Sequence, residues 1–279
     1  MKIPNRIGID QKKRSLCKYP PKIKLFGTFF DNITVNSFCN AIEAFIEKRG
    51  KLYLVTVKDV SVTVLCLENP DLHEFYNRSD LIVVDGRGLV YAAFLLYRGR
   101  QRVCELFGGP GGYYAILKRA ATKRYRVYYL GATDEIVKKA VSNVKKRHPE
   151  IIVCGSHHGY INKNNIETVL QDINNSKPDI IFVGISAKVR EPLIINYGDR
   201  FPKCVCFFIG GMIDVEAGLA KFAPRFVSHL GIEWLWRVIQ EPKRLGPRYF
   251  YTMRKFLFYL SLDLWPVFKR KNLNRHEGH

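Results

Sequence analysis

The sequence places one carboxylate where an enzyme built on a parallel sheet would need a catalytic base. Leu81–Val84 is a short, entirely apolar run, and Asp85 and Gly86 follow it directly. Ligands of open parallel sheets collect at the carboxyl ends of the strands, so Asp85 can face a substrate hydroxyl and accept its proton. The same position also suits a helix N-cap, and the spacing alone leaves both roles open for Asp85.

Glycines follow this and several further apolar runs. They are Gly86, Gly131, Gly155, Gly159, Gly184, Gly210 and Gly211. Glycine in such turns permits positive φ and exposes N–H groups that can hold phosphate oxygens at helix starts. Each turn alone is ordinary for an α/β protein, but the series favours a nucleotide or phosphorylated ligand. The sequence has neither G-x-G-x-x-G nor G-x-x-x-x-G-K-[ST], which disfavours a dinucleotide oxidoreductase and a P-loop enzyme.

The residues that most often bind metals or act as thiol nucleophiles do not form a telling pattern. His157 and His158 are adjacent, so we expect their side chains to point apart, and no third ligand lies nearby in the sequence. We therefore predict no metal site and no cofactor. The chain has 7 cysteines with no C-x-x-C spacing, which indicates reduced, largely buried thiols and no catalytic cysteine.

Short β-rich runs alternate with amphipathic helical segments along most of the chain. The expected strands are 52–56, 81–85, 126–130, 151–154, 179–183 and 204–209. The expected helices lie near 34–49, 59–67, 87–98, 113–122, 134–147, 163–175 and 189–198. Apolar strands separated by helices predict an α/β fold with a mainly parallel sheet covered on both faces. We expect a basic lead-in at 1–21, one α/β core at 22–222 and a basic helical appendage at 223–279.

The charge of the chain predicts a polyanionic partner. Lys and Arg number 45 against 25 Asp and Glu, and 10 of the basic residues fall between 237 and 275, interleaved with aromatic ones. Such a segment can lie on an anionic membrane; binding of nucleic acid is the alternative, although no nucleic-acid motif supports it. Because no apolar stretch reaches the roughly 18 residues of a spanning helix, and the N-terminus lacks a secretory signal, we expect a peripheral protein.

Several ordered motifs resemble one known family. The most specific are Gly210–Gly218, then Ala223–Arg225, then Leu230–Arg244, which reads LGIEWLWRVIQEPKR. Upstream, Ser79–Gly86 resembles the family's AD-L-x-x-x-DG, and Gly155–Tyr160 resembles its G-x-x-x-GY. With these motifs the chain resembles the WecG/TagA/CpsF glycosyltransferases, glycosyltransferase family 26, whose fold is Rossmann-like.

The resemblance implies a reaction and a place for it. The family transfers a sugar, with inversion and without a required metal, from a UDP-sugar onto an undecaprenyl-diphosphate-linked saccharide. It does so at the cytoplasmic face of the bacterial inner membrane, in the synthesis of exopolysaccharide or cell-envelope polysaccharide. A non-catalytic scaffold in a polysaccharide assembly complex is the remaining alternative, and the resemblance leaves the donor sugar, the acceptor and a homo-oligomer open.

The resemblance also implies roles for individual residues. Asp85 is similar to the family's proposed base, Thr56 to its active-site threonine, and Arg102 to a catalytic arginine. The implied substrate-binding residues are Gly86, Gly131, Gly155, Gly159, Tyr160, Gly184, Glu191, Gly210, Gly211, Asp214, Arg237, Arg244 and Arg248. Among these, the three arginines belong to the appendage, which closes over the site and grips the diphosphate; guanidinium groups suit that task without a metal.

Three motifs depart from the family pattern. T-x-N reads Thr56-Val57-Lys58 here, and P-K-Q-E reads Lys188-Val189-Arg190-Glu191, which keeps only its last residue. The motif R-V-x-G-x-D-L begins at Arg102 and loses its aspartate. We expect these changes to tune the donor sugar or the acceptor; a degraded activity is the alternative.

Overall fold

The computed structural model describes residues 22–99, 103–105, 110–224, 227 and 232–276. Its centre is a six-stranded sheet in the order β4-β3-β8-β7-β5-β6, in which every neighbouring pair is parallel. The strands are β3 (Tyr53–Lys58), β4 (Leu81–Val84), β5 (Arg126–Gly131), β6 (Ile152–His157), β7 (Ile180–Gly184) and β8 (Val205–Phe208). Because all six run the same way, their carboxyl ends lie along one edge of the sheet.

Helices cover both faces of this sheet. One face packs against α1 (Val35–Lys48), α5 (Pro110–Lys123), α6 (Asp134–Arg147) and α9 (Met212–Glu216). The other packs against α2 (Val60–Glu68), α3 (Pro70–Arg78), α7 (Ile166–Ser176) and α8 (Ala187–Tyr197). Strand β5 shows the alternation: Tyr129 belongs to the first core and its neighbour Tyr128 to the second, and both are fully buried. The predicted α/β fold with a parallel sheet between two helical layers is confirmed.

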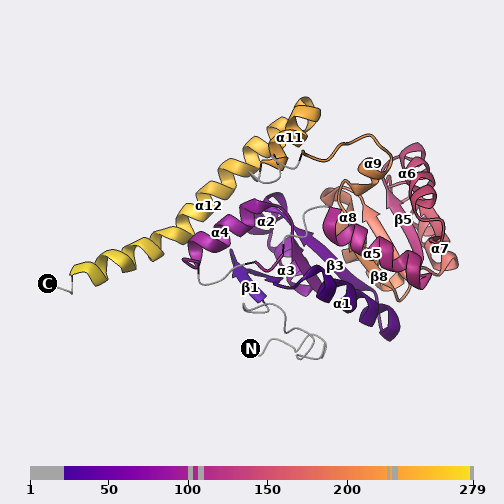
Figure 1. Cartoon of the computed structure of the whole chain (residues 1–279), viewed down its shortest axis with the longest axis horizontal. Helices are drawn as coiled ribbons and strands as arrows, with labels where there is room; N and C mark the ends of the chain where they lie inside the picture. Colours follow the sequence, from indigo (N-terminus) through magenta and orange to yellow (C-terminus); the bar gives the residue numbers. More distant parts are fainter. Residues whose placement is uncertain (1–21, 100–102, 106–109, 225–226, 228–231, 277–279) are drawn as a thin grey trace.

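A third apolar core joins the two ends of the described chain. The antiparallel hairpin of β1 (Lys22–Leu25) and β2 (Thr28–Asp31) packs with α4 (Arg87–Leu96) and with Phe256 and Leu260 of α12 (Pro242–His276). Helix α12 also contacts α2, and Figure 1 shows it passing α2 and α4 as a long arm toward the C-terminus. The appendage is therefore seated on the body by apolar contacts.

Most of the predicted elements are present, and the differences are local. All six predicted strands and all seven predicted helices are found within a few residues of their expected positions. The hairpin β1–β2 and helix α3 are additions to the prediction. Strand β6 continues to His157, so Gly155 lies inside it and not in the turn after it.

The appendage is helical, as predicted. A short helix, α11 (Glu233–Gln240), precedes α12 and contacts it. None of the described helices combines the length and the hydropathy that crossing a membrane requires. The boundary at residue 222 between core and appendage stays a prediction.

The cysteines mostly behave as expected. The free thiols are Cys39, Cys66, Cys154, Cys204 and Cys206. Burial raises the pKa of Cys39 and of Cys66 to about 11, which makes both thiols unreactive at neutral pH. Cys104, in contrast, is disulfide-bonded, so the expectation of reduced thiols throughout is wrong at that position.

Candidate functional site

Asp85 lies at the carboxyl edge of the sheet, immediately after β4. Its backbone N–H donates to the carbonyl oxygen of Lys58, the last residue of the neighbouring strand β3, at 2.9 Å. The N-cap position of α4 belongs to Gly86, which has φ +80° and makes no side-chain cap. The N-cap residue of α4 is therefore Gly86 and not Asp85, and the Asp85 side chain is half-buried at this edge.

The glycine turns along the same edge pack backbone against backbone. A Cβ added to Gly131 would lie 2.5 Å from the carbonyl oxygen of Gly184, and one added to Gly184 would lie 3.1 Å from that of Gly210. Gly159 belongs to the group, since its N–H donates to the Ala132 carbonyl at 2.9 Å. The turns after β5, β6, β7 and β8 thus form one continuous stretch of backbone at the carboxyl edge of the sheet, and ligand binding there stays a prediction.

Helix α11 brings Arg237 onto this stretch. A Cβ added to Gly211 would lie 2.9 Å from Arg237 Nη2 and 3.9 Å from Asp214 Oδ2. The side chain of Gln240 holds the helix in place, because its Oε1 accepts from the Lys221 N–H at 3.0 Å and its Nε2 donates to the Lys221 carbonyl at 3.2 Å. Gly211, Asp214 and Arg237, which the sequence predicts as substrate-binding residues, therefore lie together.

Tyr249 of α12 is a phenol whose pKa responds to both the arginines and the carboxylate. Burial raises the pKa of Tyr249; the charges of Asp59 and Asp85 raise it further, while those of Arg248 and Arg237 lower it. Tyr249 therefore lies within electrostatic range of charged groups of both signs. The sequence gives little sign of this role, because Tyr249 is one of many aromatic residues in a basic segment.

The carboxyl edge of the sheet therefore carries a proton acceptor, Asp85, and a cation, Arg237. The strands that precede Asp85 and Gly211 are separated by one strand, or roughly 10 Å at the usual strand spacing. That span suits a sugar that carries a diphosphate. A carboxylate at one end can take a proton from a hydroxyl, and a guanidinium at the other can stabilise negative charge on phosphate oxygens.

Thr56 and Glu191 are both fully buried below this edge. The Thr56 hydroxyl has no hydrogen-bond partner among the described residues. Glu191 accepts through Oε1 from the Tyr76 hydroxyl at 2.5 Å and from Arg190 Nη2 at 2.6 Å, and the Arg190 guanidinium lies 4.2 Å from the Phe208 ring centroid. Glu191 is thus tied into a buried ion pair, and its contact with substrate stays a prediction.

The remaining predicted residues are placed as follows. A Cβ at Gly155 would lie 2.5 Å from the Tyr128 ring, so this glycine makes room for a core side chain. Tyr160 and Arg248 are exposed. Arg102 lies outside the described residues, and Arg244 is placed by its backbone in α12 only. The roles of these residues stay predictions.

Lys58, which stands where the family motif T-x-N has asparagine, is the most unusual charged group near the site. Its side chain is fully buried, and Nζ has no hydrogen-bond partner among the residues that the structure describes. Burial lowers the pKa of Lys58 to about 8, and the nearby Cys66 thiol opposes that shift. A buried, unpaired ammonium group destabilises the fold. The sequence signal for it is the departure from the family motif.

Replacing Lys58 with Met is expected to raise the free energy of unfolding at pH 7. A native pKa near 8 against 10.5 for the free side chain corresponds to roughly 3 kcal/mol of destabilisation. Between these two pKa values the unfolded chain binds the proton and the native one does not, so wild-type stability rises with pH. The advantage of Lys58→Met is therefore complete below pH 8 and fades toward pH 10.5, which thermal unfolding across that range measures.

The exposed Lys145 on α6 provides the control for this prediction. Lys145→Met should change stability by less than about 0.5 kcal/mol at every pH. A Lys58→Met variant that unfolds at a lower temperature than wild type at pH 7 would mean that the ammonium group is stabilised in the native state.

The adjacent histidines do not lie as expected. Their rings pack with centroids 4.1 Å apart, and Nδ1 of His157 is 2.8 Å from the His158 carbonyl oxygen, so the expectation that the two side chains point apart is wrong. Within the described part of the chain, no group of three or more His, Cys, Asp or Glu side chains is arranged to hold a metal ion.

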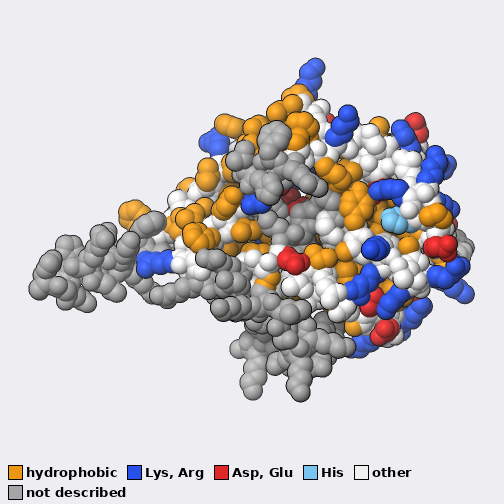
Figure 2. All heavy atoms as spheres, viewed as in Figure 1, with side chains coloured by type: hydrophobic (Ala, Val, Ile, Leu, Met, Phe, Trp, Pro, Cys, Tyr) orange, Lys and Arg blue, Asp and Glu red, His pale blue; other side chains and the backbone are white. Residues whose placement is uncertain are grey.

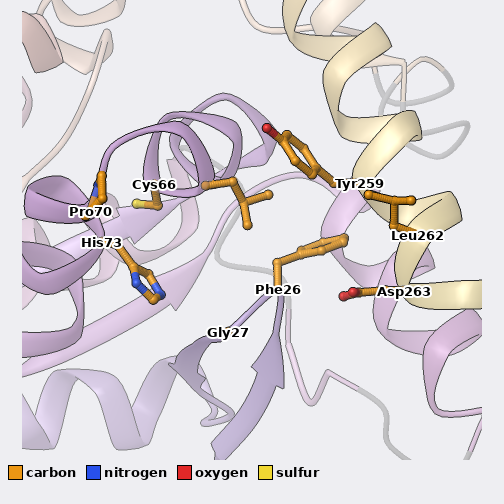
Figure 3. A pocket seen from close by; sticks show the side chains of 9 residues that line it. Phe26, Gly27, Cys66, Pro70, His73, Tyr259, Leu262 and Asp263 are labelled. Carbon is orange, nitrogen blue, oxygen red and sulfur yellow. The ribbon is translucent and has the colours of Figure 1, made fainter. Parts of the chain in front are cut away.

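A cavity of about 430 Å³ lies away from the glycine edge. Its walls come from the β1–β2 turn, from α2 and α3, and from α12, and Figure 3 shows these side chains facing one another. The lining is Phe26, Gly27, Cys66, Leu67, Pro70, His73, Tyr259, Leu262 and Asp263. Burial raises the pKa of Asp263. No predicted site residue lines this cavity, so it is separate from the candidate active site.

Comparison with known proteins identifies the family. Residues 23–270 match the family model described as the glycosyl transferase WecG/TagA/CpsF family. The match covers both the sheet with its glycine edge and most of the appendage. The chain belongs to this family. It is a glycosyltransferase, and the family resemblance seen in its motifs is confirmed.

Curated relatives of this WecG/TagA/CpsF protein include enzymes of Staphylococcus aureus. The chain is 33% identical over 227 residues to N-acetylglucosaminyldiphosphoundecaprenol N-acetyl-beta-D-mannosaminyltransferase from strain MW2, covering 81% of this chain and 87% of the relative. The proteins of the same name from strains NCTC 8325 / PS 47 and COL are equally similar, with the same coverage. The similarity therefore spans nearly the whole length of these transferases.

Proposed function

We propose that the chain transfers a sugar from a UDP-sugar to a saccharide linked to undecaprenyl diphosphate, with inversion at the anomeric carbon. The observation that carries the proposal is the placement of Asp85 and Arg237 at the same edge of the sheet, Asp85 directly after β4 and Arg237 against Gly211 after β8. This geometry offers a base for an acceptor hydroxyl and a cation for a departing diphosphate. The name of the staphylococcal relatives, which specifies an N-acetylglucosaminyldiphosphoundecaprenol acceptor, supports the class of acceptor.

The proposed step is a single in-line displacement. Asp85 accepts the proton of the acceptor hydroxyl as its oxygen forms a bond to the anomeric carbon. The bond between that carbon and the UDP oxygen breaks, and its electron pair leaves with UDP. Arg237, together with Arg244 and Arg248, stabilises the charge on the diphosphate. One displacement inverts the anomeric configuration, and the product stays attached to its lipid.

The position of the enzyme in the cell is part of the proposal. A lipid-linked acceptor lies in a bilayer, and the basic, aromatic appendage has the composition of a segment that binds an anionic membrane surface. We place the enzyme peripherally on the cytoplasmic face of the inner membrane, in the synthesis of exopolysaccharide or cell-envelope polysaccharide. Nucleic-acid binding and a scaffold role are the alternatives, and a homo-oligomer stays open.

Incubating the full chain with a panel of UDP-sugars and a short polyprenyl-diphosphate saccharide tests this proposal. We expect mass spectrometry to show one added sugar, with a UDP-N-acetylhexosamine among the accepted donors, and NMR of the product to show the inverted anomeric configuration. Retention of configuration, or transfer to a free saccharide as fast as to the lipid-linked one, would refute the proposed reaction.

A further inference from the structure

Helix α4 (Arg87–Leu96), which begins two residues after Asp85, presents a half-exposed apolar face. Tyr91, Phe94 and Leu95 are 48%, 49% and 48% exposed. Their spacing of i, i+3 and i+4 places them on one side of the helix. The opposite side is occupied, since Leu89, Ala92 and Ala93 are buried in the core that the hairpin shares with α12. This face of α4 is therefore about half exposed, whereas the opposite face is buried.

The neighbouring helix α12 continues this apolar surface. Its exposed large apolar side chains are Phe250, Tyr251, Leu257, Phe258, Leu262 and Trp265. Helices α4 and α12 are in contact, and Figure 2 shows hydrophobic side chains gathered over both of them on one side of the molecule. Soluble proteins rarely expose apolar surface on two adjacent helices, and such patches mark contact sites.

Basic groups accompany these apolar side chains. The Arg254 guanidinium lies 5.6 Å from the Phe250 ring centroid and is exposed, and Arg248 is exposed one and a half turns before it. Arg98 lies two residues after the end of α4 and is also exposed. Apolar side chains flanked by arginines match the boundary between acyl chains and anionic headgroups. Nucleic acid would use the arginines and aromatic rings but not Leu95, Leu257 and Leu262.

We infer that α4 and α12 together form the surface that binds an anionic bilayer, with Phe94 and Leu95 inserted into it. The inference rests on the membrane contact in the proposed function. It adds α4, a helix of the catalytic core, to the contact that the appendage makes. It has a geometric consequence: α4 begins two residues after Asp85, so the carboxylate is held within about 15 Å of the lipid boundary, given a rise of ~1.5 Å per helical residue.

Binding to vesicles of phosphatidylcholine with phosphatidylglycerol tests the contact. The full chain and the double variant Phe94→Ser/Leu95→Ser are compared by co-sedimentation, with Ile195→Ser on α8, also an exposed apolar residue, as the matched control. We expect the double variant to lose on the order of tenfold in partition coefficient, and the control to bind as wild type does. Equal binding by the double variant, or an equal loss in the control, would overturn the inference.

Tryptophan substitutions locate the contact directly. With brominated lipids in the same vesicles, Phe94→Trp should add fluorescence quenching beyond that of wild type, and Ile195→Trp should add none. Absence of added quenching at position 94 refutes insertion of α4. Two further measurements on the double variant can also refute it. If binding to single-stranded DNA, or self-association measured by sedimentation velocity, falls in parallel with vesicle binding, then the α4 face is not specific for the bilayer.

Transferase activity separates this inference from the proposed function. With a short, water-soluble acceptor, the double variant should match wild type in kcat, because both residues lie on the exposed face of α4 and neither is a candidate site residue. With a long-chain acceptor in vesicles it should be slower by about the loss in binding. An inactive wild-type enzyme would refute the proposed function, while the vesicle and quenching results would still decide the role of α4.

Discussion

Replacing Asp85 with Asn is expected to lower kcat by about a thousandfold. Removing a general base usually costs 10²–10⁴-fold, and Asn keeps the shape of the side chain while losing its capacity to take a proton. The residue lies at the strand edge beside Lys58 and within range of Tyr249. Because the donor is held by other groups, the Kd for UDP-sugar should change little, which isothermal titration can measure beside the kinetic assay.

Asp199, an exposed aspartate on the 3₁₀ turn η2 (Gly198–Arg200), serves as the control for this experiment. Asp199→Asn should leave kcat unchanged. If Asp85→Asn retained most of its activity, another group would be the base. If it lost UDP-sugar binding in proportion to activity, Asp85 would act in binding and the proposed proton transfer would be wrong.

Replacing Arg237 with Ala is expected to lower kcat/KM by 10²–10³-fold, mostly through kcat. The guanidinium lies against Gly211, where a diphosphate would meet the glycine edge, and charge on that group grows as UDP departs. Arg237→Lys should recover only part of the loss, because an ammonium group cannot make the paired hydrogen bonds of a guanidinium. Steady-state kinetics with varied UDP-sugar separates kcat from KM.

Arg78, whose side chain pairs with Glu74 on the exposed surface of α3, provides the comparison. Arg78→Ala should keep full activity, since a surface pair of this kind contributes little. An unchanged kcat/KM in Arg237→Ala would remove Arg237 from the leaving-group role. A higher KM with unchanged kcat would limit it to ground-state binding of the donor.

The main elements could be predicted because the sequence marks them locally. Buried parallel strands such as Leu81–Val84 are continuous apolar runs, and the helices between them show apolar spacing on one face. The hairpin β1–β2 turns at Phe26 and Gly27, both with positive φ, and lacks a common turn pair. Helix α3 has a usable signal in the N-cap Asn69 followed by Pro70, but its nine residues are too short for a clear pattern.

The site could be predicted only in part, because its completion depends on tertiary contacts. Asp85 and the glycines sit at strand ends, which the sequence reveals. The approach of Arg237 to Gly211 requires the appendage to be seated on the body. The appendage is held on the body because Phe256 and Leu260 pack against residues more than 150 positions earlier in the chain. The periodicity of apolar residues in the sequence does not predict contacts over such a separation.

The close contact among Gly131, Gly184 and Gly210 limits how this enzyme could acquire a new donor. A methyl group at position 131 would collide with the backbone of Gly184 in the adjacent turn. A substitution at position 131 would therefore push strands β5 and β7 apart, which is a larger change than altering the shape of a binding pocket. Changes in donor specificity are therefore expected at exposed side chains such as Tyr160, whereas the backbone contact between Gly131 and Gly184 must be kept. Directed evolution toward other sugars should accordingly yield no variants at Gly131 or Gly184.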